Sequence, residues 1–108
     1  MITLCDIDAI PEGASKGFEL SDGRSLFAVR KDGAVHLYRN RCPHRGVELN
    51  IQEDDFLDMD GALIICSAHG ALFQIDTGEC LAGPCQGDWL EPVPFEIRDG
   101  ALAVSAQG

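Results

Sequence analysis

Short apolar runs separated by turn residues make up most of this chain. Residues 26–30 and 35–39 are rich in apolar side chains, and Asp32-Gly33 stands between them. An Asp-Gly pair between two such runs is a strong signal of a β-hairpin, because both residues can adopt a positive φ. No apolar repeat with the period of a helix runs longer than about two turns. The pattern therefore predicts an all-β fold of about eight to ten short strands, arranged as a small antiparallel sandwich or partly open barrel.

Two more Asp-Gly pairs, at 22–23 and 99–100, mark further turns. Pro92 and Pro94 make the start of one extended segment irregular or confine it to a sheet edge, because proline cannot donate to the ladder. We expect the chain to open as a β-meander, with residues 11–17 and 79–87 as loops. The remaining strands are expected at 2–7, 18–20, 63–66, 71–75, 90–98 and 101–104.

Length and charge limit the possible classes of protein. The 108 residues predict a single domain, 1–108. The formal net charge of -10 argues against nucleic acid or an anionic membrane as partner and permits a partner with a basic face. Neither a signal peptide nor a membrane span is recognisable, which predicts a cytoplasmic protein. In that compartment, the five cysteines favour metal ligation, redox chemistry or free thiols over a disulfide framework.

An acidic stretch, residues 53–60, holds five carboxylates. A calcium loop of the EF-hand type requires oxygen ligands at alternate positions before its glycine and a closing glutamate. Phe56 occupies one of those positions and Ser67 stands at the closing one. The stretch is therefore interpreted as a solvated loop, with a partner-docking patch as the alternative.

Two short clusters carry the candidate chemistry. Residues 42–46 read Cys-Pro-His-Arg-Gly, and residues 66–70 read Cys-Ser-Ala-His-Gly. Zinc sites usually pair like ligands, two cysteines in one place and two histidines in another, whereas each cluster here is mixed. In a two-iron cluster, mixed pairs allow one iron to take both thiolates and the other both imidazoles, which raises the reduction potential. The candidate ligands are Cys42, His44, Cys66 and His69; Cys5 and His36 stand apart and are expected to be structural.

The two clusters together resemble the fingerprint of the Rieske [2Fe–2S] family. The resemblance extends over residues 71–78, the Gly83-Pro84 pair and residues 93–104. It implies the Rieske fold, in which a cluster-binding subdomain is inserted into the β-scaffold. It also implies that Cys42 and Cys66 bind the buried iron, and that His44 and His69 bind the outer iron with their far edges toward solvent.

Four positions differ from the high-potential branch of that family. Val47 and Ala68 stand where that branch has cysteines joined as a disulfide, and Ala71 and Phe73 stand where it has a serine and a tyrosine that donate to cluster sulfurs. The resemblance therefore implies a potential near the low end of the Rieske range, roughly −150 mV.

Cys80 and Cys85 are not needed for four-fold ligation. They flank Gly83-Pro84, which in the family covers the cluster. A disulfide, a redox role and plain packing are all open, and free thiols are favoured.

A chain of this size has no dinucleotide fingerprint and no second metal site. The economical interpretation is a one-electron carrier rather than an enzyme. The resemblance implies transfer from a flavin-dependent ferredoxin reductase to a terminal oxygenase of the ring-hydroxylating type. Two alternatives remain: a small Rieske subunit of a larger oxidoreductase such as a nitrite reductase, and a structural zinc module.

Overall fold

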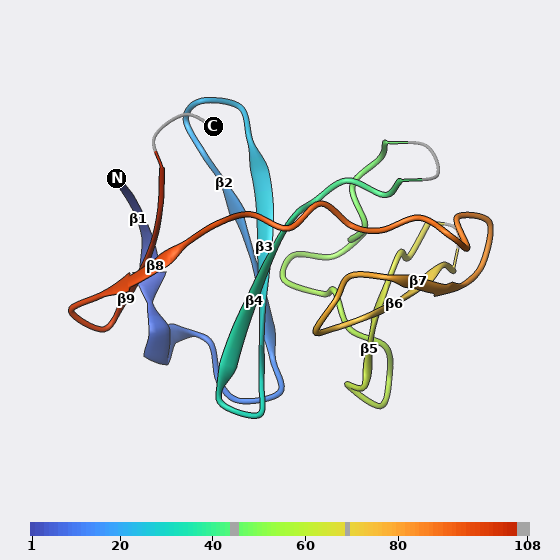
Figure 1. The fold of residues 1–108 in the computed structure, drawn as a ribbon, viewed down its shortest axis with the longest axis horizontal. Helices are drawn as coiled ribbons and strands as arrows, with labels where there is room; N and C mark the ends of the chain where they lie inside the picture. The colour runs from blue at the N-terminus through green and yellow to red at the C-terminus, as the bar shows by residue number, and fades with distance from the viewer. Residues whose placement is uncertain (44–45, 69, 106–108) are drawn as a thin grey trace.

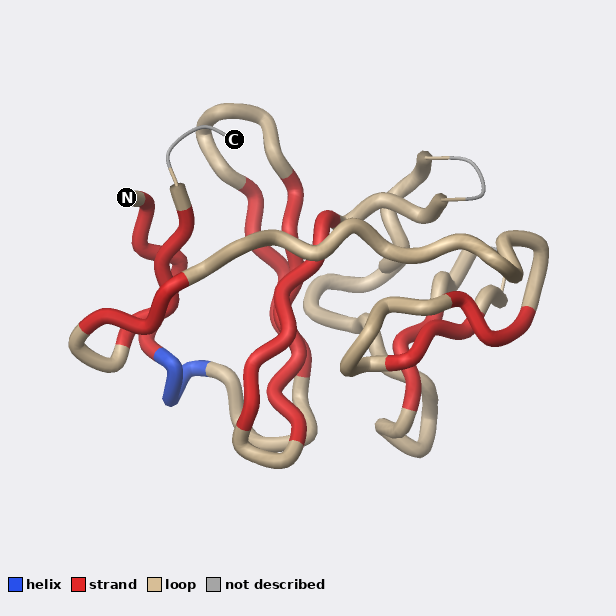
Figure 2. Tube along the Cα trace, in the orientation of Figure 1, coloured by secondary structure: helices blue, strands red, loops and turns tan. Residues whose placement is uncertain are grey.

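The computed structural model describes residues 1–43, 46–68 and 70–105, and the regular secondary structure in these ranges is almost entirely β-strand, joined by long loops (Figures 1 and 2). A short 3-10 turn, η1 (Ile7–Ala9), is the exception. Within the same ranges no helix has the length and apolar character needed to cross a membrane. The strands are β1 (Ile2–Asp6), β2 (Ser15–Glu19), β3 (Ser25–Lys31), β4 (Ala34–Arg39), β5 (Leu63–Ile65), β6 (Leu72–Gln74), β7 (Cys80–Ala82), β8 (Glu96–Arg98) and β9 (Ala101–Val104).

These strands form three antiparallel sheets with the orders β1-β9-β8, β2-β3-β4 and β5-β6-β7. Figure 1 shows the β2-β3-β4 sheet between the other two, with β1, β8 and β9 toward one end of the long axis and β5 to β7 toward the other. The third sheet and its loops come from the chain between β4 and β8, so they form an insertion in the scaffold. The predicted all-β class with an inserted subdomain is confirmed.

Strand β3 is buried on both of its faces. Side chains alternate between the two faces of a strand, and here each face has its own core. Leu26 and Ala28 pack in a core with Leu102 and Val104 of β9, which we call the scaffold core. Phe27 and Val29 pack in a second core that contains the cysteines of the inserted part, which we call the cluster core. The unbroken apolar run in the sequence reflects this double burial.

The cluster core is joined to the central sheet by aromatic side chains. The Phe27 ring stacks on Phe56, with centroids 4.4 Å apart and the planes within 4°. The Tyr38 hydroxyl donates a hydrogen bond of 2.7 Å to the Ile75 carbonyl oxygen. Burial raises the pKa of Tyr38 to about 12, so this donor keeps its proton at neutral pH.

The turns follow the sequence prediction. At Asp32-Gly33 the φ angles are 53° and 79°, and at Asp99-Gly100 they are 50° and 78°. Two consecutive positive φ values are those of a type I′ turn, whose twist matches the flanking strands. Both hairpins, β3–β4 and β8–β9, are therefore confirmed.

Three expectations about the strands are wrong. β1 pairs with β9 rather than β2, so the opening meander is only β2-β3-β4. β2 begins at Ser15, inside the expected loop, because Gly17 pairs with Phe27 and allows the Phe56 ring to approach: a Cβ at Gly17 would lie 3.2 Å from that ring. Residues 80–82, also expected in a loop, form β7 along the edge of β6.

Candidate metal centre

The two sequence clusters form loops with the same backbone hydrogen bonds. In the first loop, residues 42–47, the Cys42 N–H donates to the Val47 carbonyl at 2.7 Å and the Gly46 N–H donates to the Cys42 carbonyl at 2.7 Å. In the second loop, residues 66–71, the Cys66 N–H donates to Ala71 at 2.8 Å and the Gly70 N–H donates to Cys66 at 2.7 Å. The offsets along the chain are identical, so each loop presents its cysteine from an equivalent turn.

Glycine is required in both turns. The φ angles of Gly46 and Gly70 are 72° and 73°, in the left-handed region that other residues avoid. The two glycines noted in the sequence thus have matching roles, which explains why each ligand pair is followed by one.

A buried asparagine, not identified from the sequence, supports the first loop. The Asn40 side chain is 7% exposed, and its Oδ1 accepts a hydrogen bond of 2.8 Å from the Leu49 N–H. Its Nδ2 donates to Asn50 Oδ1 at 2.9 Å. The Leu49 carbonyl in turn accepts a 2.8 Å bond from the Ser67 N–H, which ties the first loop to the second. Only the position of Asn40, just after a strand, could have drawn attention to it.

Cys42 and Cys66 come together in the cluster core, each with no exposed surface. Ala71 and Phe73 are fully buried in the same core, so the two positions that distinguish the high-potential branch lie beside the cysteines. His44 and His69 lie outside the described residues, and the four-ligand set therefore stays a prediction. The described donors fit a two-iron cluster: two buried thiols on equivalent, connected loops supply the soft ligands such a cluster takes.

The other two singled-out residues lie away from these loops, as expected. His36 faces Val29 across the β3–β4 pair and is half-buried. Cys5 packs against the scaffold core, and burial raises the pKa of its thiol.

Cys80 and Cys85 also belong to the cluster core. Both are free thiols, as the sequence favoured, but their contact was not predicted: the two Sγ atoms are 2.9 Å apart. Burial, followed by the hydrogen bond with Cys80, raises the pKa of Cys85 to about 12.

The turn between Cys80 and Cys85 presses on the second loop. A Cβ on Gly83 would lie 2.8 Å from the Ala71 Cα, closer than non-bonded atoms approach. The backbone of Gly83 therefore rests directly on Ala71, and only glycine permits this packing.

The acidic stretch is partly structural. The Gly17 N–H donates to Asp54 Oδ1 at 2.7 Å and the Ser15 hydroxyl donates to the Asp54 carbonyl at 2.8 Å. Glu53 and Asp55 are exposed, as a solvated loop predicts. The stretch is thus fastened to β2 through one of its five carboxylates.

Comparison with known proteins decides the family. The model of the Rieske [2Fe-2S] domain matches residues 1–98. The chain belongs to the Rieske [2Fe–2S] domain family. The Rieske-type [2Fe–2S] cluster is accordingly its cofactor.

Relatives of similar length are named ferredoxins or ferredoxin components. The ferredoxin component of the p-cumate 2,3-dioxygenase system of Pseudomonas putida is 30% identical over 104 residues, which cover 96% of this chain and 84% of that protein. The structure of the ferredoxin of Sphingomonas yanoikuyae B1 is 28% identical, with a TM-score of 0.75 and 96% of each chain covered. A ferredoxin solved in complex with the oxygenase of carbazole 1,9a-dioxygenase shares the fold, with a TM-score of 0.76 at 21% identity, and the match covers 96% of this chain and 91% of that one.

Proposed function

We propose that residues 1–108 form one Rieske domain that carries single electrons from a flavin-dependent reductase to a terminal oxygenase of the ring-hydroxylating type in the cytoplasm. In this proposal Cys42, His44, Cys66 and His69 hold the cluster. When bound, the cluster supplies a one-electron couple. The observation that carries the proposal is the pair of equivalent loops that present two buried cysteines to one core.

The described residues have two tasks in this function. Leu49, Phe56, Phe73 and Leu90 are buried in the same core as Cys42 and Cys66, and neither cysteine has any exposed surface. The side chains of Phe73 and Ala71 have no hydroxyl group that could donate a hydrogen bond to a sulfur. Because hydrogen bonds to the sulfurs raise the potential, this packing supports a carrier at the low-potential end of the family.

The match to a ferredoxin component supports a carrier over a permanent subunit of a larger enzyme. The relative from the p-cumate system, itself named a ferredoxin component, is matched over 84% of its length. Isolation of this chain only in a stoichiometric complex with a catalytic subunit would contradict the proposal.

The test is spectroscopic and kinetic. We expect the purified protein to contain two irons and two sulfides per chain and, once reduced, to show the rhombic paramagnetic signal of a Rieske cluster. Reduced protein mixed with a ring-hydroxylating oxygenase should be reoxidised in a single-exponential step. A colourless protein with one zinc per chain would refute the proposal and favour the zinc module.

The charge beside the first loop suggests how partners are recognised. A cleft of about 430 Å3 lies between the central sheet and the acidic stretch. Four carboxylates line it, those of Glu19, Glu48, Glu53 and Asp54. A partner with a basic face would be steered toward this side of the molecule.

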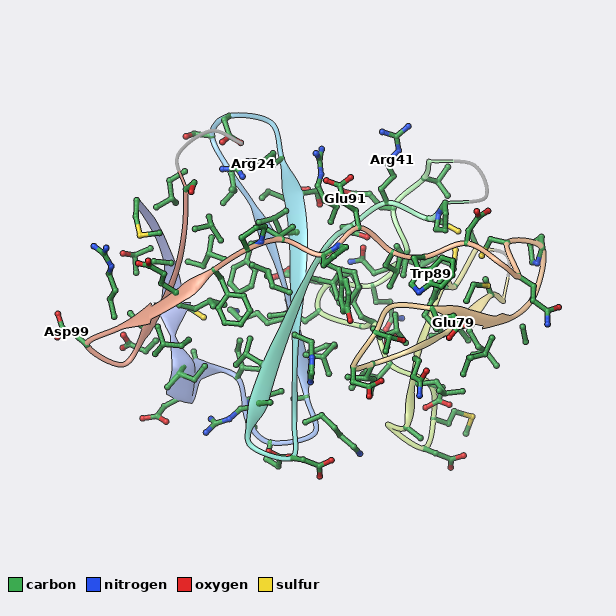
Figure 3. The ribbon with its side chains drawn as sticks, viewed as in Figure 1. Arg24, Arg41, Glu79, Trp89, Glu91 and Asp99 are labelled. Carbon is green, nitrogen blue, oxygen red and sulfur yellow. The ribbon has the colours of Figure 1, made fainter. Side chains whose placement is uncertain are left out.

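Neutralising that cleft should slow association. We expect the double variant Glu48→Gln/Glu53→Gln to reduce the second-order rate of electron transfer to the oxygenase about three- to tenfold at low salt, and the difference should fade at about 0.5 M salt because charges are screened. Stopped-flow absorbance measures both rates. Asp99→Asn is the matched control: it removes one charge at the far hairpin tip (Figure 3), where asparagine tolerates the φ of 50°. Because the control removes one charge and the double variant two, slowing by the control of about half the size on a logarithmic scale would show that only net charge matters.

Restoring the missing hydroxyls should raise the potential. We expect Ala71→Ser/Phe73→Tyr to shift the midpoint potential upward, within the family range of roughly −150 to +300 mV, because both positions adjoin the cysteines in the cluster core. Protein-film voltammetry gives the value. Ala28→Ser, equally buried but in the scaffold core, should leave it unchanged. A double variant with an unaltered potential would show that these residues do not set it.

A further inference from the structure

Two thiols that are not candidate cluster ligands meet beside those that are. The Sγ atoms of Cys80 and Cys85 lie 2.9 Å apart, and each residue is 2% exposed. Carbon atoms, which are smaller than sulfur, rest at about 3.5–4.0 Å from one another. A disulfide bond is about 2.03–2.05 Å long. The two sulfurs are therefore closer than ordinary packing brings such atoms and need only a small shift to bond.

The backbone holds the two cysteines in this arrangement. The Cys80 N–H donates to the Asp88 carbonyl at 2.9 Å, and the Asp88 N–H donates to the Cys85 carbonyl at 2.9 Å. The Cys80 thiol also lies 3.3 Å from the Ala82 carbonyl oxygen, to which it can donate a hydrogen bond. The contact thus belongs to the fold of the turn and does not depend on the rotamer of one side chain alone.

The turn that joins the pair is open to solvent. Residues 81–84 are all exposed, although the sulfurs beneath them are buried. A small oxidant can reach a sulfur when this exposed turn opens locally. A cysteine pair in a reducing compartment that can be reached in this way is suited to transient oxidation rather than to structural cross-linking.

We propose that Cys80 and Cys85 are a second redox site, which is oxidised reversibly to a disulfide by a low-molecular-weight disulfide of the glutathione class. One Cys80–Cys85 S–S bond forms and two S–H bonds break. The two electrons and two protons pass to the oxidant, whose own S–S bond breaks to give two thiols. The site is a two-electron couple and takes no electron from the one-electron carrier.

The pair is coupled to the metal centre through Cys42. Cys42 is buried in the same core as the pair. If Cys42 is a cluster ligand, as proposed above, the reduced pair offers its sulfur an S–H donor, and the disulfide withdraws that donor. Since hydrogen bonds to ligand sulfurs raise the potential of an iron–sulfur cluster, oxidation of the pair should lower it.

Mass spectrometry tests the site directly. The cluster-loaded Cys5→Ser protein is equilibrated without oxygen in glutathione buffers of increasing oxidised fraction, quenched in acid, unfolded and alkylated with N-ethylmaleimide. We expect two of the four remaining thiols to become protected together at the oxidising end, with no added glutathione mass, and dithiothreitol to restore both. Four alkylated thiols at every ratio, or a single glutathione adduct in place of paired protection, would overturn the proposal.

Matched variants assign the pair. Cys80→Ser and Cys85→Ser, each in the Cys5→Ser background, should lose the paired protection; its persistence in either variant would place the disulfide elsewhere and overturn the proposal. The midpoint potential of the loaded protein should shift downward on oxidation of the pair and be unresponsive in Cys80→Ser. An identical potential in both states would overturn the coupling to Cys42. Failure of the proposed carrier function would show separately, as absence of the cluster spectrum, because the alkylation readout does not require a cluster.

Discussion

Replacing His44 by alanine is expected to give a folded protein without a [2Fe–2S] cluster. In the proposed ligand set the outer iron has two protein ligands, His44 and His69, and loss of either removes one of them. Iron and sulfide content should fall to background, and the visible absorbance and the paramagnetic signal of the reduced protein should disappear. His69→Ala should do the same, whereas far-ultraviolet circular dichroism should still show β-structure from the scaffold sheets.

His36→Ala is the matched control for this experiment. His36 is the remaining histidine of the chain and lies on β4 opposite Val29. Because it belongs to the β3–β4 hairpin and not to either loop, the variant should keep its cluster and its spectrum. An intact Rieske signal in His44→Ala would refute the ligand assignment, and loss of the cluster in all three variants would point to general instability instead.

Gly83→Ala should lower the stability more than any other added methyl in the turn between Cys80 and Cys85, which packs on the second loop. The new Cβ would lie 2.8 Å from the Ala71 Cα, a backbone atom that cannot move without displacing the loop that carries Cys66. The φ angle of Gly83, 104°, adds the strain of positive φ. Together these effects should cost about 2–4 kcal/mol of stability and should also accelerate loss of the cluster on heating.

Gly87→Ala separates the two causes. Gly87 lies in the same segment with a φ of 99°, but a Cβ there would meet nothing within 4 Å. This variant should lose only the stability that positive φ costs a residue with a Cβ, about 1 kcal/mol. Thermal midpoints followed by visible absorbance and by circular dichroism should therefore fall in the order wild type, Gly87→Ala, Gly83→Ala. Equal midpoints for the two variants would mean that the contact with Ala71 carries no energetic weight.

The parts of this fold that could be predicted from the sequence are those set by local chemistry. The Asp-Gly turns require positive φ, and the apolar run 26–30 requires burial, so the hairpins followed directly. The mixed thiol–imidazole spacing identified the two loops before any geometry was known. By contrast, β7 was missed because Gly83 and Pro84 mark a loop in sequence terms, while pairing with β6 overrides that tendency for residues 80–82.

Contacts between segments account for the other differences. The partner of β1 is β9, almost the whole chain away, and no local pattern distinguishes it from β2. Asn40 reads as an ordinary polar residue after a strand, and its role depends on the Leu49 N–H nine residues later. The Cys80–Cys85 contact arises from the return of the chain beyond β7, which a loop assignment hides.

Strand β3 divides the molecule in a way that amide exchange should reveal. Phe27 and Val29 support one core while Leu26 and Ala28 support the other, so neighbouring residues of one strand report on different halves. Loss of the metal centre removes order from only one side of this strand. The amides that hydrogen-bond β1 to β9 should then stay protected from exchange, while those that hydrogen-bond β5 to β6 should lose protection. Strand β3 would thus lie at the border between a part of the fold that is stable without the cofactor and a part that depends on it.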